Sequence, residues 1–476
     1  MKILLTGATG FLGPHIARKL LLADHELNVL TRDVKSARET FPFPARLFTW
    51  DPQAGLPPPD SLDGVEAVIH LAGESVAGHR WTFEQKKRIL NSRVLSTRNL
   101  REAVRKQPGV RALVSASAIG IYGDRGEETL SEQSAPGSGF LAEVCQRWEA
   151  EIFAGGADAV RTAAIRTGIV LGREGGALAR LAPLFRLGVA GPVGGGRQWM
   201  SWIHVEDLAS VYVEAITNDS WRGPINAVAP RPVTNAAFST TLGKVLHRPA
   251  FLPAPAWGLK FAMGEMASIV LDSQRVEPRK LKELGFHFEY DELSLALSDL
   301  CAPEGSLGCD VFSADQWIDR PVEAVFAFFA DAKNLETITP PWMGFQVTGM
   351  STPQIQQGTL IDYRLKVHGV PMSWRTLIEE WEPNRRFVDN QLRGPYSRWH
   401  HTHSFHPVNG GTLMRDRVLY RLPLGVAGRT AAHWKVRRDV EEIFRFRKQK
   451  IETLFPSRGS DESRPGFVRG ADQPAE

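Results

Sequence analysis

Short, unbroken apolar runs alternate with longer amphipathic stretches along the first part of the chain. Between the runs, apolar residues recur every three or four positions over segments such as 82–106, which is the spacing of a helix with one buried face. This alternation predicts an α/β fold with a parallel sheet covered by helices on both faces. The runs predict buried strands at 3–5, 27–30, 47–50, 67–71 and 112–116.

The pattern changes after about residue 300. Every-second-residue alternation replaces the buried runs, and a segment at 434–455 has the apolar stripe of a long helix. We therefore predict a second, α+β domain at 311–455, joined by a polar linker at 299–310. The tail at 456–476 is expected to be disordered. Strands of the second domain are predicted at 359–366, 373–382, 386–392, 399–406 and 412–420.

A glycine-rich turn, Thr6 to Gly13, directly follows the first strand and precedes a helix. Gly7 permits a tight turn, Gly10 lets the backbone approach a pyrophosphate, and Gly13 allows close packing of helix on strand. The helix N-terminus then offers free N–H groups to the phosphates. The spacing predicts a dinucleotide-binding site. The predicted cofactor-binding residues are Gly7, Thr9, Gly10, Phe11, Leu12, Gly13, Arg32, Asp51, Leu71, Ala72, Gly73 and Ser115.

The end of the second strand distinguishes between the two nicotinamide cofactors. An acidic residue there accepts hydrogen bonds from the ribose 2′-hydroxyl of NAD, whereas an arginine pairs with the 2′-phosphate of NADP. Arg32 occupies this position. We therefore expect NADP rather than NAD.

Composition adds few constraints. A formal charge of +4 over 476 residues, without a basic stripe outside the last helix, gives no reason to expect a nucleic-acid partner. Three cysteines without ligand or disulfide spacing suit a reducing cytoplasm. The chain starts on a core strand and has no apolar run of membrane-spanning length, so we expect neither a signal peptide nor an integral membrane segment. The oligomeric state stays open.

Several motifs together resemble an extended short-chain dehydrogenase/reductase, and more narrowly the atypical epimerase family proteins. The resemblance covers residues 1 to about 298 and implies a Rossmann-like doubly wound sheet with a small C-terminal cap at about 246–298. The second domain is similar to the helix-grip fold of START-like and polyketide cyclase proteins, which implies a cavity for an apolar ligand. The motifs of the first resemblance are Thr6–Gly13, His70–Gly73, Ser117 with Tyr122–Gly123, Arg166–Gly172, Gly194–Met200 and Trp202–Asp207.

The resemblance also exposes a missing catalytic pair. Reductases of this kind use a tyrosine and a lysine four residues later, and no tyrosine of this chain is followed in that way. Leu141 and Cys145 stand where the pair belongs. Cys145 is a reactive thiol if Arg93 lowers its pKa, or else a small buried residue.

The remaining candidates complete the predicted site. Ser117 and Tyr122 join Cys145 as catalytic candidates. Two functions stay open. The first is an NADP-dependent oxidoreductase or epimerase-like enzyme acting on a small, hydrophobic substrate that the C-terminal domain captures. The second is a catalytically silent NADP-binding module coupled to a hydrophobic-ligand carrier domain. The candidate substrate contacts are Glu74, Arg93, Arg166, Arg197 and His204, although His204 is better placed to start a helix.

Aromatic residues and histidines crowd the strands of the second domain. Trp374, Trp381, Trp399 and Phe405 either line a cavity or fill the core. His401 and His403 lie on one face of their predicted strand, but a metal site also requires carboxylates or cysteines. The strand supplies none, and we predict no metal.

Overall fold

A computed structural model describes residues 1–154, 160–301, 309–422 and 425–457. The chain divides into two compact units. The first contains residues 1–41 and 47–307, and the second contains 42–46 and 308–476. Among the described residues, no helix is both long enough and apolar enough to cross a lipid bilayer. The predicted disordered tail beyond residue 457 lies outside the described residues.

The first unit is built on a seven-stranded sheet with the order β11-β7-β5-β4-β1-β2-β3. The pairings from β11 through β2 are parallel, as the alternation of strands and helices predicts. The predicted strands correspond to β1 to β5, whereas β7 and β11 were not predicted. The strands are β1 Lys2–Thr6, β2 Glu26–Thr31, β3 Arg46–Thr49, β4 Ala67–His70, β5 Ala112–Ala118, β7 Arg161–Thr167 and β11 Gly223–Ala227.

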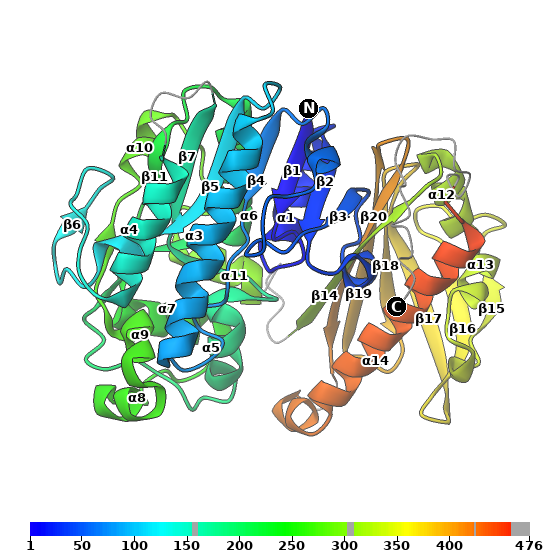
Figure 1. Cartoon of the computed structure of the whole chain (residues 1–476). Coiled ribbons are helices and arrows are strands. Elements are labelled where there is room, and N and C mark those ends of the chain that lie inside the picture. The colour runs from blue at the N-terminus through cyan, green and yellow to red at the C-terminus, as the bar shows by residue number, and fades with distance from the viewer. Residues whose placement is uncertain (155–159, 302–308, 423–424, 458–476) are drawn as a thin grey trace, which may run out of the picture. The chain divides into compact units, whose positions relative to one another are not determined.

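Helices cover both faces of this sheet (Figure 1). Helix α1 packs on α6 at one face, and α3 packs on α4 at the other. The fully buried residues of β1 and β4 form the centre of the core between these layers. The helices in this part of the chain are α1 Gly13–Leu22, α2 Val34–Thr40, α3 Phe83–Arg105, α4 Phe140–Ile152 and α6 Val205–Thr217, while α5 Gly176–Arg186 belongs to the cap.

The rest of the first unit forms the cap, which has a hydrophobic core of its own between α5, α7 and α11. Residues 299–301, which we expected in the linker, are the last residues of α11, and Cys301 is buried. The rest of that predicted linker, 302–308, lies outside the described residues. Helices here are α7 Asn235–Leu246, α8 Ala256–Met263, α9 Ser268–Leu271, α10 Arg279–Glu283 and α11 Leu293–Cys301. Short strands are β6 Thr129–Leu130, β8 Ile169–Leu171, β9 Trp199–Met200, β10 Trp202–His204, β12 Val233–Thr234 and β13 Arg275–Val276.

The second unit is a seven-stranded antiparallel sheet with the order β14-β20-β19-β18-β17-β16-β15, packed against the long helix α14. All five alternating segments predicted for this unit are strands, while β15 and α13 were missed and α14 starts earlier than expected. Its strands are β14 Asp310–Ile318, β15 Gln346–Met350, β16 Leu360–Val367, β17 Val370–Glu382, β18 Arg386–Arg393, β19 Arg398–Val408 and β20 Gly411–Arg421. Its helices are α12 Val322–Phe329, α13 Ala332–Thr337 and α14 Gly425–Leu454.

Candidate functional site

The glycine turn after β1 is shaped by close backbone contacts. Gly7 adopts a φ of 71°, and a Cβ there would lie 2.9 Å from the carbonyl carbon of Leu71. A Cβ on Gly13 would lie 2.2 Å from the carbonyl oxygen of Ala8, so only glycine fits where α1 begins. The turn therefore has the tight geometry that a dinucleotide-binding loop requires.

A side chain of β1 joins the turn to the loop after β4. Thr6 Oγ1 accepts hydrogen bonds from the backbone N–H groups of Leu71 and Ala72, both at 3.2 Å. Thr6 Oγ1 also lies 2.7 Å from Nδ1 of His70, whose pKa burial lowers to about 4. His70 is therefore neutral at physiological pH, and it acts as an internal hydrogen-bonding group.

A cleft of about 870 Å³ opens at the carboxyl ends of β1, β2 and β4. It brings together most of the predicted cofactor-binding residues with Glu74, a candidate substrate contact. Sequence reasoning missed Asp33, Ser36 and Gln53, which also line it. The predicted residues that line the cleft are Gly7, Thr9, Gly10, Arg32, Asp51, Leu71, Ala72, Gly73 and Glu74.

The other predicted cofactor residues lie outside the lining of this cleft. Phe11 packs against the loop after β8, where a Cβ on Gly175 would lie 2.2 Å from its ring. Leu12 is the residue that precedes α1, and Gly13 packs against Ala8. Ser115 is fully buried in β5. These residues shape the turn and the sheet around the cleft.

The charged residues after β2 have different roles. Arg32 is exposed and lines the cleft, and no described residue hydrogen bonds to its guanidinium or pairs with it. The carboxylate of Asp33 accepts a hydrogen bond from the backbone N–H of Ser36 at 3.1 Å and so caps α2. Arg32 is therefore a cation at this end of the cleft with no partner among the described residues.

A buried polar network fills the region where the reductase family places its catalytic residues. Ser117 Oγ donates a hydrogen bond of 2.7 Å to Glu149 Oε1. Arg166 donates two hydrogen bonds to the same carboxylate, at 2.9 and 2.8 Å, and a third to Tyr122 Oη at 2.9 Å. Tyr122 in turn donates to Asn226 Oδ1 at 2.7 Å. All five side chains are buried.

This network changes the predicted roles of three residues. The hydroxyls of Ser117 and Tyr122 and the guanidinium of Arg166 are engaged by partners inside the protein rather than presented to the cleft. Burial also raises the pKa of Tyr122, although Arg166 opposes the shift. The phenol therefore lacks the lowered pKa that an acid–base catalyst needs at neutral pH. The carboxylate that holds the network, Glu149, was missed; it lies four residues after Cys145 on the same face of α4.

The structure distinguishes between the two interpretations of Cys145, a reactive thiol and a buried packing residue. Its pKa is raised to about 12 because burial outweighs the lowering effect of the charge on Arg93. Cys145 and Leu141 instead pack against Gly120, where a Cβ would lie 3.8 and 3.4 Å from them. The thiol stays protonated at neutral pH, and its buried packing is the interpretation that the structure supports.

Arg93 holds the backbone of the loop after β4 by a hydrogen bond. Its Nη1 donates hydrogen bonds to the carbonyl oxygens of Glu74 and Ile89, at 2.9 and 3.0 Å, and its guanidinium lies over the ring of Trp148. A Cβ on Gly73 would lie 3.3 Å from the guanidinium carbon. Arg93 therefore holds the backbone of this loop, and it is not among the residues that line the cleft, where we predicted a substrate contact.

The last two predicted substrate contacts lie elsewhere. His204 is 1% exposed; its Nδ1 accepts a hydrogen bond from the backbone N–H of Glu206, and its ring stacks on Tyr290. It starts α6, as its position in the sequence favoured, and is not available to a substrate. Arg197 is exposed and does not line the cleft.

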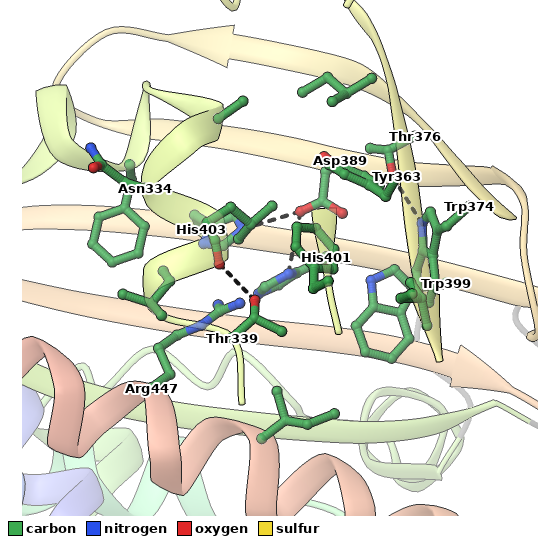
Figure 2. A pocket seen from close by; sticks show the side chains of 18 of the residues that line it. Asn334, Thr339, Tyr363, Trp374, Thr376, Asp389, Trp399, His401, His403 and Arg447 are labelled. Carbon is green, nitrogen blue, oxygen red and sulfur yellow. Dashed lines mark hydrogen bonds and ion pairs between the residues drawn. The ribbon is translucent and has the colours of Figure 1, made fainter. Parts of the chain in front are cut away.

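The second unit encloses a cavity of about 150 Å³ between the sheet and helices α13 and α14. Trp374 and Trp399 line it, as Figure 2 shows, whereas Phe405 is in the hydrophobic core and Trp381 packs beside Phe387. Of the two alternatives that the sequence left open, two of the four aromatic residues thus line a cavity and two pack in the core. His401, His403, Asp389 and Arg447 line the same cavity, and Asp416 lies beside them.

The fold and the cleft define a dinucleotide-binding protein of the extended short-chain dehydrogenase/reductase class, with a helix-grip domain added. Residues 3–227 match the NAD dependent epimerase/dehydratase family, and 254–300 match a domain of unknown function, DUF1731. Residues 318–445 match the polyketide cyclase / dehydrase and lipid transport family. The chain belongs to the epimerase family proteins, and the matches confirm both predicted resemblances.

Curated and structural relatives match the first unit. The chloroplastic SDR39U1 homolog of Arabidopsis thaliana is 41% identical over 303 residues, 62% of this chain and 86% of that protein. YfhF of Bacillus subtilis is 39% identical over 304 residues, 63% and 98% of the two chains. The crystal structure of human SDR39U1 with NADPH has a TM-score of 0.57 at 33% identity and covers 63% of this chain and 99% of that one.

Proposed function

We propose that the first unit binds NADPH in the cleft after β1, with Arg32 pairing with the 2′-phosphate of the adenosine ribose. The observation that carries this proposal is the unpaired, cleft-lining guanidinium beside an aspartate that is already engaged as a helix cap. An arginine matches the geometry of a phosphate, whereas NAD would need a free carboxylate at this place. The NADPH bound to human SDR39U1 supports the same choice.

The affinities of the full chain for NADPH and NADH test this proposal. Replacing Arg32 with Ala removes a charge-assisted contact worth about 1.5–3 kcal/mol, so NADPH affinity should fall roughly 10- to 150-fold. NADH affinity should stay unchanged, because NADH has no 2′-phosphate. Arg147→Ala, which removes another exposed arginine of the same unit, is the matched control. Equal affinity of the unmodified protein for the two cofactors would refute the role of Arg32.

We further propose that the unit is an oxidoreductase that transfers hydride without a tyrosine–lysine pair. Hydride transfer requires a positioned nicotinamide and a polarised acceptor, and the protein supplies binding and orientation. Glu74 is the ionisable side chain that lines the cleft directly after the Leu71–Gly73 loop, and we assign it to orienting the substrate. The acceptor is a small, hydrophobic molecule, and the proton that accompanies the hydride comes from solvent.

A catalytically silent NADPH-binding module is the second candidate. The buried network around Glu149 favours it, because Ser117 and Tyr122 are held away from the cleft. Incubating the protein with NADPH deuterated at C4 and a panel of carbonyl and enone acceptors distinguishes the two. Stereospecific loss of deuterium establishes an oxidoreductase, whereas tight NADPH binding with no loss across the panel supports the silent module.

For the second unit we propose binding of an apolar ligand. Its cavity is lined mainly by aromatic and aliphatic side chains with a few polar groups among them, the usual character of a small-molecule site. A polyene fatty acid that accepts energy from tryptophan is a suitable probe, because Trp374 and Trp399 line the cavity. Saturable energy transfer that Trp374→Phe reduces would support the proposal; its absence from the full chain would refute it.

A further inference from the structure

Two imidazoles and two carboxylates meet in the second unit: His401, His403 and Asp389 line the cavity (Figure 2), and Asp416 lies beside the two histidines. His401 and His403 point to the same side of β19. Asp389 lies opposite His401 on β18, and Asp416 lies opposite His403 on β20. Each of these side chains is buried or nearly so. The carboxylates that the sequence analysis found missing from the histidine strand are thus supplied by both neighbouring strands.

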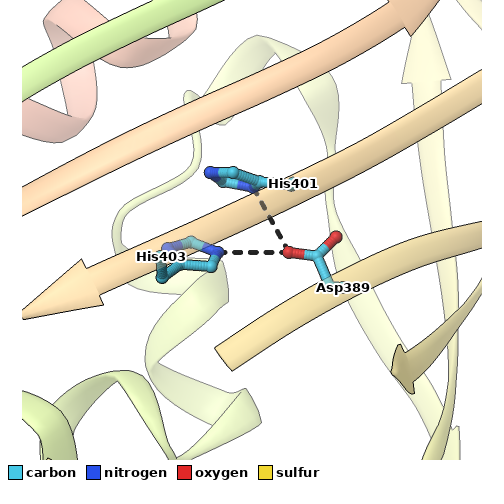
Figure 3. A group of neighbouring side chains, drawn as sticks. All are labelled: Asp389, His401 and His403. Atoms are coloured by element: carbon cyan, nitrogen blue, oxygen red, sulfur yellow. Dashed lines mark hydrogen bonds and ion pairs between the residues drawn. The ribbon is translucent and has the colours of Figure 1, made fainter. Parts of the chain in front are cut away.

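Three of these side chains converge on a single point, as Figure 3 shows. Asp389 Oδ2 lies 3.2 Å from Nδ1 of His401 and 3.1 Å from Nε2 of His403. The three atoms lie within 4.8 Å of one another.

These distances fit a bound metal ion. Transition-metal bonds to imidazole nitrogen and carboxylate oxygen are about 2.1 Å long, so neighbouring ligand atoms of a tetrahedral or octahedral ion lie about 3.0–3.4 Å apart. The two separations from Asp389 fall in this range. Two histidines and one carboxylate form a recurring open metal-binding set that leaves coordination positions free.

The fourth residue orients the two rings. Nε2 of His401 lies 2.9 Å from Asp416 Oδ1 and hydrogen bonds to it, and Nδ1 of His403 lies 2.8 Å from the same oxygen. A carboxylate on the far nitrogen of a ligating histidine fixes the ring and directs the other nitrogen, with its lone pair, to the metal. Here the carboxylate of Asp416 hydrogen bonds to the ring of His401 and lies beside the ring of His403, and the guanidinium of Arg447 lies 3.7 Å from the same oxygen.

We propose that Asp389, His401 and His403 bind a divalent first-row transition-metal ion. The three ligands also line the cavity, so the remaining coordination positions of the ion face the cavity interior. Water or an oxygen atom of a cavity ligand completes the coordination. The proposal concerns the second unit and does not depend on NADPH binding by the first.

A cobalt titration of the full chain, first stripped of metal with a chelator, tests the site. Co²⁺ in a four- or five-coordinate site has visible absorption bands far stronger than those of the six-coordinate aqueous ion, and elemental mass spectrometry also counts a six-coordinate ion. We expect saturation at about one equivalent, displacement of the band by Zn²⁺, and about one metal per chain by elemental mass spectrometry. A chain that gives no saturable band and retains less than about a tenth of an equivalent would overturn the proposal and leave an ion-free ring of imidazoles and carboxylates.

Variants locate the site. His403→Gln and Asp389→Asn should each weaken Co²⁺ binding at least 10-fold, whereas His400→Gln should bind as the unmodified protein does. His400 is the matched control because it lies on the same strand with its side chain on the other face, 3.8 Å from Glu379. Unchanged binding in both ligand variants would refute the assignment. NADPH titration of the same samples shows whether the first unit is intact, and it separates a failure of this proposal from a failure of the cofactor proposal.

Discussion

Replacing Glu149 with Gln removes the charge that holds the buried network of the first unit together. The side chains of Glu149 and Arg166 are 9% and 8% exposed, so the variant leaves a buried guanidinium without its counter-charge. Breaking a buried ion pair from one side costs about 3–5 kcal/mol. The glutamine still accepts one hydrogen bond, so we expect the lower end, about 3 kcal/mol. At roughly 2 °C per kcal/mol for a large domain, the midpoint of thermal unfolding falls by about 6 °C.

The assay must report on the first unit alone, because the chain has two compact units and a single global midpoint is not well defined. Hydrogen exchange of peptides from α4 and β7, followed by mass spectrometry through a urea series, reads the stability of the affected region directly. Both elements contain a partner of the pair, so their exchange should accelerate together in the variant.

Glu143→Gln is the matched control on the same helix. Glu143 pairs with Arg147 at the surface, where the side chains are 56% and 58% exposed, and such a pair contributes about 0.3–0.5 kcal/mol. If Glu149→Gln shifts the urea midpoint no more than this control does, the buried network does not stabilise the fold. Glu149 would then not hold Ser117 and Arg166 in place.

Two further predictions concern the same unit. Cys145 should resist a thiol reagent such as DTNB at pH 7.5, because burial raises its pKa to about 12; rapid labelling of Cys145 in the native chain would contradict its assignment as a packing residue. The pKa of His70 is about 4 when folded and 6.5 when unfolded, so the unfolded chain binds more protons between these values. Stability should therefore fall by about 3 kcal/mol as the pH is lowered from 6.5 to 4, and urea unfolding of His70→Gln should show a shallower dependence over that window.

The strands that sequence patterns located are those whose side chains match their surroundings. The strands β1, β2 and β4 read as apolar because both of their faces are covered by helices. Strand β7 was missed because two arginines interrupt its apolar run. The structure shows why they are tolerated: Arg161 donates to the carbonyl oxygens of Ala215 and Trp221, and Arg166 pairs with Glu149. Such long-range compensation leaves no periodic signal in the sequence.

The cofactor cleft could be predicted from the sequence, whereas the buried network around Glu149 could not. The glycine turn is a local structure, so its spacing predicts both its conformation and its place at the end of β1. The hydroxyl of Ser117 is held by Glu149, which lies 32 residues away in sequence and on a different element. A signal was nevertheless present, because Glu149 follows Cys145 by one helical turn on the face where the catalytic pair was sought.

The hairpin between β19 and β20 fixes which residues of the two strands lie opposite one another at the proposed metal site. Asn409 and Gly410 both have positive φ, 49° and 74°, and join β19 to β20 in a two-residue hairpin. Pairing of Val408 with Gly411 then fixes every later pair across the two strands, including His403 with Asp416. Asparagine–glycine between two alternating strands is a strong hairpin signal, so the sequence already held the information that places a carboxylate opposite a histidine. The histidine strand itself has no carboxylate, but the strand paired with it across the hairpin supplies Asp416.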